Sequence, residues 1–291
     1  MPKECKKKVL VVGHRGMLGK ALVKELDESF QILVCEEVDI TKPESVRSCI
    51  KKNLPQIVIN SAAYTDVDGA ETHQSKALAV NAYGAGNVAQ TAKEFAVESL
   101  VHLSTDYVFD GEKGTPYTEE DTPNPKNVYG KSKLEGEKMV LSKYPNALIV
   151  RTAWLYGAGG KNFVDIILKL AAEKDKLTVV NDQRGSPTWT VHLARAIIKL
   201  LEKSARGIVH LTNSGEVTWF GFAKKIIETA QIKNVEVTPI TTEQLGRPAR
   251  RPSNSVLDCS RYEAITGEKM PNWEVALKEY IENQLMGDRR R

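Results

Sequence analysis

The chain has 291 residues, of which 41% are hydrophobic and 27% charged, and its formal net charge is +4. This length fits one large domain or a domain with a substantial second lobe, and so small a charge does not indicate a nucleic-acid partner. No apolar run approaches the roughly 18 residues of a membrane span, and the run after the first lysines is shorter than the core of a secretory signal.

The cysteines and histidines show no metal-binding pattern. Cys5, Cys35, Cys49 and Cys259 are scattered without a metal-ligand spacing, which is typical of a protein in a reducing cytosol. The five histidines form no ligand motif such as HExxH. The sequence therefore predicts a cytoplasmic protein with no metal site and no membrane segment.

The first half of the chain alternates short apolar runs with helical patterns. Strands are predicted at residues 7–12, 31–35, 56–60, 98–104 and 146–151. Helices are predicted after the glycines that follow the first strand, and at about 43–53, 74–96 and 128–142. Thr41 and Glu44 have the spacing of a capping box ahead of the second helix.

This alternation indicates an α/β fold. Because each strand is a continuous apolar run, we expect a Rossmann-type, doubly wound parallel sheet with helices on both faces. After residue 151 the pattern changes to helices, short strands and loops rich in Pro, Gly and Arg. We predict a dinucleotide-binding domain over 1–151, to which about 189–211 returns, and a smaller substrate-binding lobe over 152–291, above the carboxyl ends of the strands.

A glycine motif joins the first strand to the first helix. Gly13, Gly16 and Gly19 form GxxGxxG at this turn. Glycine permits a tight turn and lets the backbone approach a pyrophosphate at the amino end of the helix. Glycines alone also serve packing in many turns, but the strand before and the helix after favour dinucleotide binding.

Two loops follow predicted strands at the carboxyl edge of the sheet. SAAYTDVD (61–68) has small residues, Ser61, Ala62 and Ala63, against which a cofactor could lie. STDYVFDG (104–111) places the hydroxyls of Ser104 and Thr105 at this edge, with the acid Asp106 beside them. Close packing in the first loop and a capped turn in the second are the simpler explanations.

Tyr129 and Lys133 are spaced four residues apart in VYGKSKLEGEK (128–138) and share a helix face. A nearby ammonium favours the phenolate, so we expect Lys133 to lower the pKa of Tyr129 toward neutral pH. Thr105 could then hold a substrate oxygen against the phenol. Such a tyrosine is a general acid for a carbonyl that receives hydride from a nicotinamide. An isolated YxxxK on a surface helix would be a common accident, but here it follows the glycine turn and the STD loop in order.

Strings along most of the chain resemble one family. GHRGMLG, NSAAYTDVDGAE, STDYVFDG, NVYGKSKLEGE, RTAWLYG, NDQRGSPT and RPARRPSNSVLD are similar to extended short-chain dehydrogenases/reductases, and more narrowly to dTDP-4-dehydrorhamnose reductases. The resemblance implies NAD(P)H-dependent reduction of the C4 ketone of dTDP-6-deoxy-L-lyxo-4-hexulose to dTDP-L-rhamnose. The substrate would be a nucleotide sugar, and a homodimer is left open.

The resemblance also implies roles for individual residues. Thr105 would bond the C4 carbonyl oxygen, Tyr129 would donate the proton, and Lys133 would orient the nicotinamide ribose and tune Tyr129. Asn81 would be a structural asparagine. The implied cofactor-binding residues, with those from the glycine turn and its neighbours, are Gly13, Arg15, Gly16, Met17, Leu18, Asp39, Ile40, Ala62, Ala63, Tyr64, Tyr129 and Lys133. The implied substrate-facing residues are Thr65, Thr105, Asp106, Tyr107 and Trp154.

Arginines in GRPARRP (246–252) lie in the predicted substrate lobe. Arginine suits bidentate phosphate recognition, so we expect one of Arg247, Arg250 and Arg251, with Arg250 and Arg251 preferred, to bind the substrate pyrophosphate. A solvated basic loop is the alternative.

Cofactor preference depends on two opposing signals. Glu36 and Glu37 close the second strand, where an acid usually bonds the ribose 2′-hydroxyl and favours NADH. Arg15 precedes the second glycine, where its guanidinium can reach a 2′-phosphate. We expect both cofactors to be used and NADPH to be preferred.

The chain departs from some relatives at a metal site. Members of the resembled family hold Mg²⁺ with acidic side chains, but the nearby positions here are Ala21, Val191 and His192, and a hard cation needs oxygen ligands. We therefore do not expect metal-dependent dimerisation.

Rival functions share parts of the pattern. Sugar-nucleotide 4,6-dehydratases place a glutamate where this chain has Tyr107, and GDP-fucose synthases need a cysteine and a histidine that are lacking here. A reductase of another nucleotide-linked 4-ketosugar stays open, as does a non-catalytic NADP-binding subunit similar to the β subunit of methionine adenosyltransferase.

Overall fold

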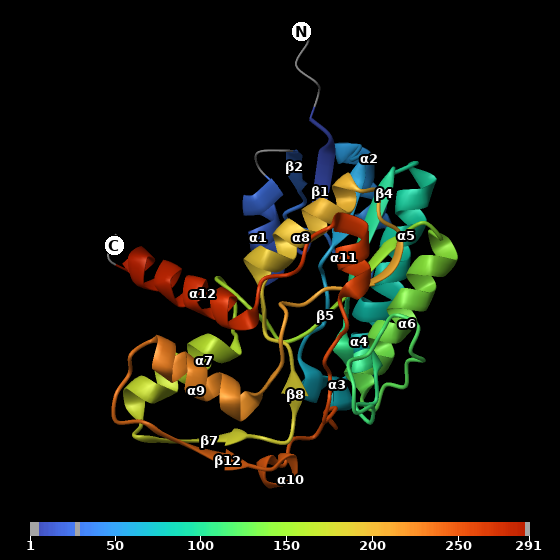
Figure 1. Ribbon diagram of the computed structural model, residues 1–291. Coiled ribbons are helices and arrows are strands. Elements are labelled where there is room, and N and C mark those ends of the chain that lie inside the picture. Colours follow the sequence, from blue (N-terminus) through green and yellow to red (C-terminus); the bar gives the residue numbers. More distant parts are fainter. Residues whose placement is uncertain (1–5, 27–29, 289–291) are drawn as a thin grey trace.

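The computed structural model describes residues 6–26 and 30–288 of the chain (Figure 1). Its centre is a six-stranded sheet whose strands are all parallel. In spatial order the strands are β2 (Gln31–Val34), β1 (Lys8–Val12), β3 (Ile57–Asn60), β4 (Ser99–Thr105), β5 (Leu148–Thr152) and β10 (Gly207–His210). The order 2-1-3-4-5 reverses between β1 and β3, which makes this the switch point where ligands bind in open α/β sheets.

Helices cover both faces of this sheet and complete three layers (Figure 1). On one face, apolar side chains of the sheet pack against α1 (Met17–Leu26), α8 (Thr190–Glu202) and α11 (Ser260–Thr266). On the other face they pack against α2 (Pro43–Asn53), α5 (Ala85–Glu94) and α6 (Val128–Lys143). The prediction of a doubly wound, Rossmann-type α/β fold is confirmed.

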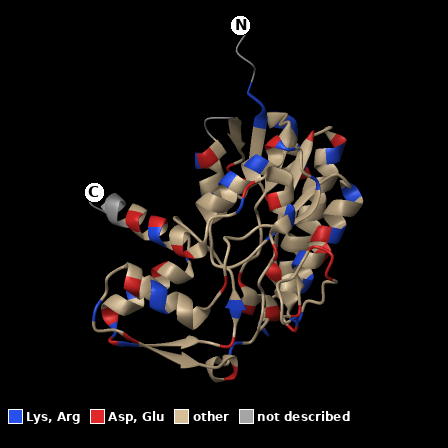
Figure 2. Ribbon diagram, in the orientation of Figure 1, with Lys and Arg blue, Asp and Glu red and all other residues tan. Residues whose placement is uncertain are grey.

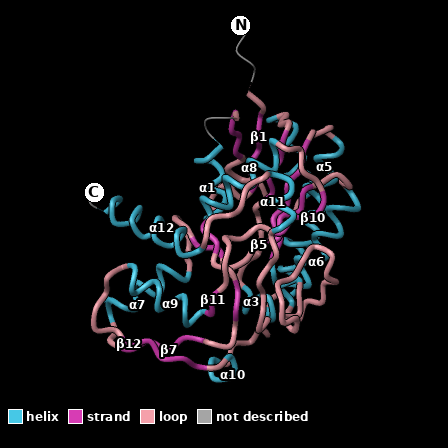
Figure 3. The backbone as a smooth tube through the Cα atoms, in the orientation of Figure 1, coloured by secondary structure: helices cyan, strands magenta, loops and turns pink. Residues whose placement is uncertain are grey.

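Short helical segments join these layers. The first two are α3 (Val67–Thr72) and α4 (Gln74–Leu78), and a π-helical segment at Ala79–Gly84 leads from α4 into α5. A 3₁₀ turn at Asp106–Val108 follows β4, and a long loop then runs to α6 (Figure 3). The predicted helix at 74–96 is therefore present, with a π-helical interruption in its middle.

The predicted capping box of α2 is wrong. Its N-cap is Lys42, which has no side-chain capping bond. Thr41 instead bonds Asp39, whose Oδ1 accepts from the Thr41 backbone N–H at 3.0 Å and from the hydroxyl at 2.7 Å. The Asx-type turn forms in place of the capping box because Asp39 is only two residues from Thr41, whereas Glu44 is three. One carboxylate oxygen of Asp39 also accepts from two donors of Thr41.

A second lobe lies across the carboxyl ends of the strands (Figure 1). Three two-stranded pairs run through it: β6 (Leu155–Tyr156) with β9 (Thr188–Trp189), β7 (Lys176–Val180) with β12 (Glu236–Ile240), and β8 (Arg184–Gly185) with β11 (Val217–Thr218). Its helices are α7 (Phe163–Glu173), α9 (Trp219–Thr229), α10 (Thr242–Leu245) and α12 (Trp273–Asp288). An aromatic-rich core holds this lobe together.

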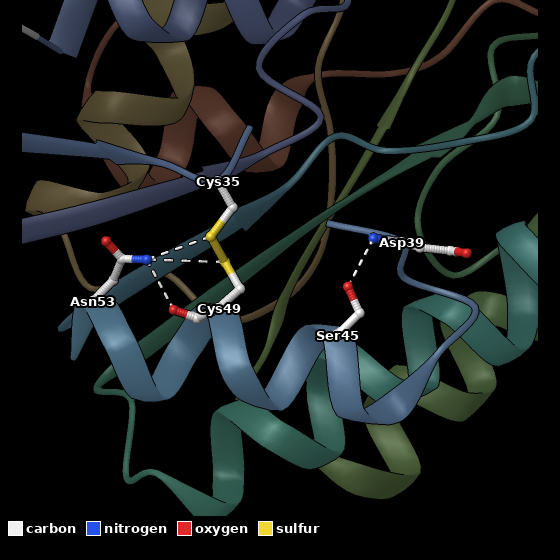
Figure 4. The surroundings of a disulfide bond; sticks show 5 residues. All are labelled: Cys35, Asp39, Ser45, Cys49 and Asn53. Carbon is white, nitrogen blue, oxygen red and sulfur yellow. Dashed lines mark hydrogen bonds between the residues drawn. A yellow bond between two sulfur atoms is a disulfide. The ribbon is translucent and has the colours of Figure 1, made fainter. Parts of the chain in front are cut away.

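Cys35 and Cys49 form a disulfide between the end of β2 and helix α2 (Figure 4). Their Cα atoms are 6.2 Å apart, and the Asn53 side-chain amide donates to the Cys49 carbonyl oxygen at 2.8 Å beside the bridge. The sequence analysis took the scattered cysteines as typical of a protein in a reducing cytosol and did not predict this pairing, so the cysteines do not support that expectation. The bridge fixes the strand end that carries Glu36 against the helix beside it.

Basic and acidic residues are interspersed along the ribbon of both lobes (Figure 2). Within residues 6–26 and 30–288, no helix combines the length and the apolar character needed to cross a membrane.

Candidate active site

The predicted site residues gather at one edge of the sheet because all its strands are parallel. Gly13 follows β1, Ala62 follows β3, Thr105 ends β4 and Trp154 comes two residues after β5. Helix α6, which carries Tyr129 and Lys133, packs beside β4. The topology thus brings together segments that are up to about 140 residues apart in the chain, as the carboxyl ends of parallel strands must.

The three glycines of the first turn serve different purposes. Gly13 has φ of +83°, and a Cβ there would lie 2.6 Å from the Ala62 backbone nitrogen. At Gly19 a Cβ would lie 2.2 Å from the Gly13 carbonyl oxygen, so this glycine permits close packing of helix on strand. A Cβ at Gly16 would meet only the Gly13 carbonyl oxygen, at 3.4 Å.

Gly16 is therefore the glycine that the chain's own packing least requires. It is exposed at the amino end of α1, where backbone N–H groups and the helix dipole favour an anion. Open space at this position fits the close approach of a pyrophosphate. The geometry of the turn thus suits a dinucleotide, with Met17 beside it and the side chain of Leu18 directed into the core.

Arg15 and Glu36, which are predicted to act in opposite directions on cofactor preference, are in contact. Arg15 donates to Glu36 Oε2 at 2.7 Å, and both side chains are 67% exposed. The Arg15 contact, with its positive charge, lowers the pKa of Glu36. Glu36 therefore holds the Arg15 guanidinium that is predicted to bind a 2′-phosphate. The two residues predicted to meet the adenosine ribose are thus coupled to each other.

Residues after β2 and β3 shape the rest of the predicted cofactor surface. Asp39 is exposed and bonded to Thr41, whereas Ile40 is buried in the core below it. Asn81, from the π-helical segment, accepts from the Tyr64 N–H at 2.8 Å and donates to the Tyr64 carbonyl oxygen at 3.0 Å. Asn81 also donates to the Ser132 hydroxyl at 2.9 Å, so one buried amide fixes the loop from Ala63 to Thr65 against helix α6.

Tyr129 and Lys133 lie on one face of α6, but they do not interact as expected. Burial raises the pKa of Tyr129 to about 12, against the lowering effect of a hydrogen bond from Thr105. Lys133 is 3% exposed, and its Nζ donates to the Leu103 carbonyl oxygen at 2.5 Å. The prediction that Lys133 lowers the pKa of Tyr129 is thus wrong, because burial dominates and the ammonium is directed to the backbone of β4.

Lys133 itself has an altered pKa. Burial lowers it to about 8, while the negative charge of Glu137 acts in the opposite direction. Glu137 is fully paired: it accepts from Arg151 at 2.9 and 2.7 Å and from the Ser104 hydroxyl at 2.5 Å. This buried ion pair, which the sequence analysis missed, supplies the negative charge nearest to the lysine.

Thr105 and Asp106 form a buried polar pair beside Tyr129. The Thr105 hydroxyl donates to Asp106 Oδ1 at 2.9 Å. Burial raises the pKa of Asp106 to about 6, although the nearby Ser255 and Thr105 hydroxyls lower it. Asp106 Oδ2 is buried, and among the described residues no donor forms a hydrogen bond of good geometry with it.

Tyr107 links helix α6 to the arginine loop, residues 246–252. Its ring contacts Tyr129 edge-on, with centroids 5.8 Å apart, and its hydroxyl interacts with Arg251. Arg251 forms a bidentate pair with Asp68, with both N–O distances 2.9 Å. Its guanidinium also donates to the Ala249 carbonyl oxygen at 2.9 Å. Asp68 was not singled out from the sequence, because its partner lies 183 residues away.

The other arginines of this loop are freer. Arg250 is 69% exposed and lies 3.8 Å from Glu112, and Arg247 is 57% exposed and lies 3.7 Å from Asp68. The Arg250 carbonyl oxygen accepts from Asn127, the N-cap of α6, at 2.8 Å. The loop therefore holds the start of helix α6, and of the two arginines predicted to bind phosphate, Arg250 has the more available side chain.

The described residues contain no cluster of three or more side chains suited to a metal ion. His192, one of the positions compared with metal-binding relatives, contacts Glu279 of α12 at 3.1 Å.

Comparison with known proteins now places the chain. A family model described as the RmlD substrate binding domain matches residues 7–286. The chain belongs to this family.

Relatives in the RmlD family cover almost the whole chain. The dTDP-4-dehydrorhamnose reductase of Streptomyces griseus is 42% identical over 279 residues, which are 93% of this chain and 91% of that protein. A probable dTDP-4,6-dihydroxy-2-methyloxan-3-one 4-ketoreductase of Streptomyces antibioticus is 39% identical over 274 residues, 93% of each chain. The crystal structure of dTDP-4-dehydrorhamnose reductase from Bacillus anthracis in complex with NADP is 40% identical, with a TM-score of 0.93, and the match covers 96% of this chain and 99% of that one.

These matches confirm the family resemblance and the expectation of an NAD(P)H-dependent oxidoreductase. The roles given to single residues stay predictions, which the geometry above makes specific.

Proposed function

We propose that this chain reduces the C4 ketone of dTDP-4-dehydrorhamnose with NADPH or NADH and forms dTDP-L-rhamnose. The observation that carries the proposal is the grouping of the Tyr129 phenol with the Thr105 hydroxyl and Lys133 at the carboxyl ends of the strands. Relatives at about 40% identity that carry this reductase name support the choice of substrate.

The geometry of the site suits the direction of reduction. Reduction requires a proton donor, and the raised pKa of Tyr129, about 12, keeps its phenol protonated at neutral pH. The bound nicotinamide supplies the hydride. Tyr129 would give its proton to the C4 oxygen. Lys133, still largely charged at pH 7 with a pKa of about 8, would stabilise the phenolate that remains once its ammonium turns from the Leu103 carbonyl oxygen toward Tyr129.

Thr105 and Asp106 would orient the sugar. In the ligand-free chain the Thr105 hydroxyl donates to Asp106. A rotation of this hydroxyl releases its proton toward the C4 oxygen, and Asp106 can then accept from a sugar hydroxyl. Each hydrogen bond that strengthens as negative charge develops on the C4 oxygen lowers the barrier.

The cofactor fits the residues present. The open Gly16 backbone at the start of α1 would hold the pyrophosphate, and the Arg15 and Glu36 pair would meet the adenosine ribose. We propose that NADPH is preferred, since a guanidinium forms charge-assisted bonds to a 2′-phosphate, and that NADH is also used.

The experiment that tests this function measures turnover with a defined substrate. Purified protein is mixed with NADPH and enzymatically prepared dTDP-4-dehydrorhamnose, oxidation is followed at about 340 nm, and the product is identified by chromatography against dTDP-L-rhamnose. Oxidation with formation of this product supports the proposal. A chain that binds NADPH but turns over none of this substrate refutes it.

One specific observation favours a second candidate. The 4-ketoreductase of Streptomyces antibioticus is almost as similar as the rhamnose-pathway relatives, so a different nucleotide-linked 4-ketosugar is the alternative substrate. A panel of dTDP-4-ketosugars that differ in configuration separates these two candidates. A non-catalytic subunit would turn over none of them.

We also propose that the enzyme acts in the cytoplasm, where nucleotide sugars and reduced nicotinamides are made, and that a homodimer is its assembly. Light scattering after gel filtration measures the assembly directly.

A further inference from the structure

Trp154 has an unusual backbone conformation at the edge of the site. It lies between β5 and β6 and has φ of +49°, in the left-handed region. A bulky residue rarely adopts this conformation, and where it does the surrounding structure holds it in place. Such positions are concentrated at functional sites, so the contacts that hold Trp154 are of interest.

Two contacts define the position of the Trp154 ring. The indole of Trp219 stacks on it, with centroids 3.5 Å apart and planes within 4°. Gly185 approaches so closely that a Cβ there would lie 2.4 Å from Cε2 of Trp154. A side chain at position 185 would therefore displace the ring, and loss of Trp219 would remove its only stacked aromatic neighbour among the described residues.

One short antiparallel strand pair positions both residues that contact Trp154. Gly185 pairs with Val217 and Arg184 pairs with Thr218, in the antiparallel pair β8 and β11. Thr218 is the N-cap of α9, accepts from the Gly221 N–H at 3.1 Å and donates to Asn181 at 2.8 Å. Trp219 is the first residue of that helix, so the strand pair fixes Gly185 and Trp219 relative to each other.

Trp219 is in turn held by the core of the second lobe. Its ring centroid is 4.5 Å from that of Phe163 and 6.4 Å from that of the buried Phe222. Trp154 and Trp219 both remain partly exposed, although rings of this size usually bury most of their surface. The stacked pair therefore connects the lobe core to a surface at the carboxyl ends of the strands.

We propose that Trp219 is a positioning residue for the sugar nucleotide: its stacking fixes the Trp154 ring in the orientation that receives the substrate. This inference rests on the proposed function, in which Trp154 faces the nucleotide sugar. Among the described residues, the rings that contact Trp219 are those of Trp154, Phe163 and Phe222, and Tyr129 is not one of them. Loss of Trp219 should therefore weaken substrate binding and leave cofactor binding and the chemical step nearly unchanged.

The test compares Trp219→Ala with Trp219→Phe and with Phe220→Ala. Phe220 is the next residue of α9 and packs against the same core, so its truncation removes a comparable ring without touching Trp154. An aromatic pair corresponds to a roughly 2- to 12-fold effect on an equilibrium. We expect Trp219→Ala to raise KM for the sugar nucleotide by about tenfold relative to Phe220→Ala, with NADPH affinity and kcat within about threefold of wild type.

Trp219→Phe keeps an aromatic face and should restore KM to within about threefold of wild type. The stacked indoles should also give an exciton couplet in far-ultraviolet circular dichroism that Trp219→Phe and Trp219→Ala both lose and Phe220→Ala retains. Equal KM values for Trp219→Ala and Phe220→Ala, or a parallel loss of NADPH affinity, would overturn the proposal.

A binding measurement separates this inference from the proposed function. Equilibrium binding of dTDP alone, followed by isothermal calorimetry, requires no turnover. If wild type binds dTDP but does not reduce the ketosugar, the proposed reaction fails, and weaker dTDP binding by Trp219→Ala than by Phe220→Ala still supports the positioning role. If Trp219→Ala does not fold, Gly185→Ala takes its place, because a Cβ at position 185 would displace the Trp154 ring; KM and dTDP affinity equal to those of Phe220→Ala would then count against the positioning role.

Discussion

The buried ammonium of Lys133 should give the reaction an alkaline limit near pH 8. Burial disfavours the charged form and lowers the pKa of Lys133 to about 8, so the charge is lost as pH rises through this value rather than near 10.5. Since the charged lysine stabilises the phenolate left by Tyr129, activity should fall with it. The protonated fraction is about 90% at pH 7 and roughly 9% at pH 9.

The assay is the dependence of kcat/KM on pH, with NADPH saturating and the sugar nucleotide varied, from about pH 6 to about pH 10. This ratio reports groups in the enzyme before the sugar binds. Above pH 8 we expect kcat/KM of the wild type to decrease about tenfold per pH unit. In Lys133→Arg the guanidinium stays charged throughout this range, so the limb near pH 8 should disappear even if the rate is lower overall.

NADPH affinity is measured by fluorescence over the same pH range. This measurement does not require turnover, so it can be made on Lys133→Arg whatever its rate. A wild-type profile that stays flat beyond pH 9 would refute the reasoning. So would an identical limb in Lys133→Arg, because the titrating group would then be another residue.

Three other predictions follow from contacts near the site. Arg15→Ala should lose the preference for NADPH, by about 10- to 150-fold if one charge-assisted bond is removed, while Glu36→Gln should strengthen this preference by releasing Arg15. Initial rates with NADPH and with NADH measure the preference of each variant. A wild type that prefers NADH tenfold would contradict this reasoning. Asp68→Asn should weaken the bidentate pair with Arg251 and lower the free energy of unfolding by about 1–2 kcal/mol, an amount reduced by the partial exposure of the pair. Arg250→Ala, the control, should leave the free energy of unfolding unchanged. Equal urea midpoints for the two variants would count against a stabilising role of the pair. Reduction of Cys35–Cys49, which closes a short loop, should lower stability by up to about 3 kcal/mol, and a melting temperature unaffected by dithiothreitol would show that the bridge does not contribute.

Much of the fold could be read from local patterns. The five strands predicted before residue 151 are present within two residues of their expected ends, because a strand buried on both faces must be a continuous apolar run. The glycine turn could also be predicted. Gly13 and Gly19 are required by close backbone contacts with residues a few positions away or at the end of the neighbouring strand. Segments at the carboxyl ends of parallel strands then had to share one edge.

What could not be predicted depends on contacts between distant residues. Asp68 pairs with Arg251, and Trp219 stacks on Trp154. Helix and strand periodicity indicates only local contacts, so it could not predict these two pairs of residues that lie far apart in the chain. The interaction of Lys133 with Tyr129 was expected from helical spacing alone, but spacing does not say where a long side chain points, and the Leu103 carbonyl oxygen accepts from the ammonium. The capping box failed for a similar reason, since Asp39 competes for Thr41.

The most direct test of the account is the turnover of Tyr129→Phe. This change removes one oxygen atom from the proposed proton donor and leaves the ring that contacts Tyr107. We predict that kcat for reduction of dTDP-4-dehydrorhamnose falls by at least about 100-fold, the usual share of general acid catalysis, while the dissociation constant of NADPH is unchanged. A kcat close to that of the wild type would contradict the assignment of Tyr129 as the proton donor.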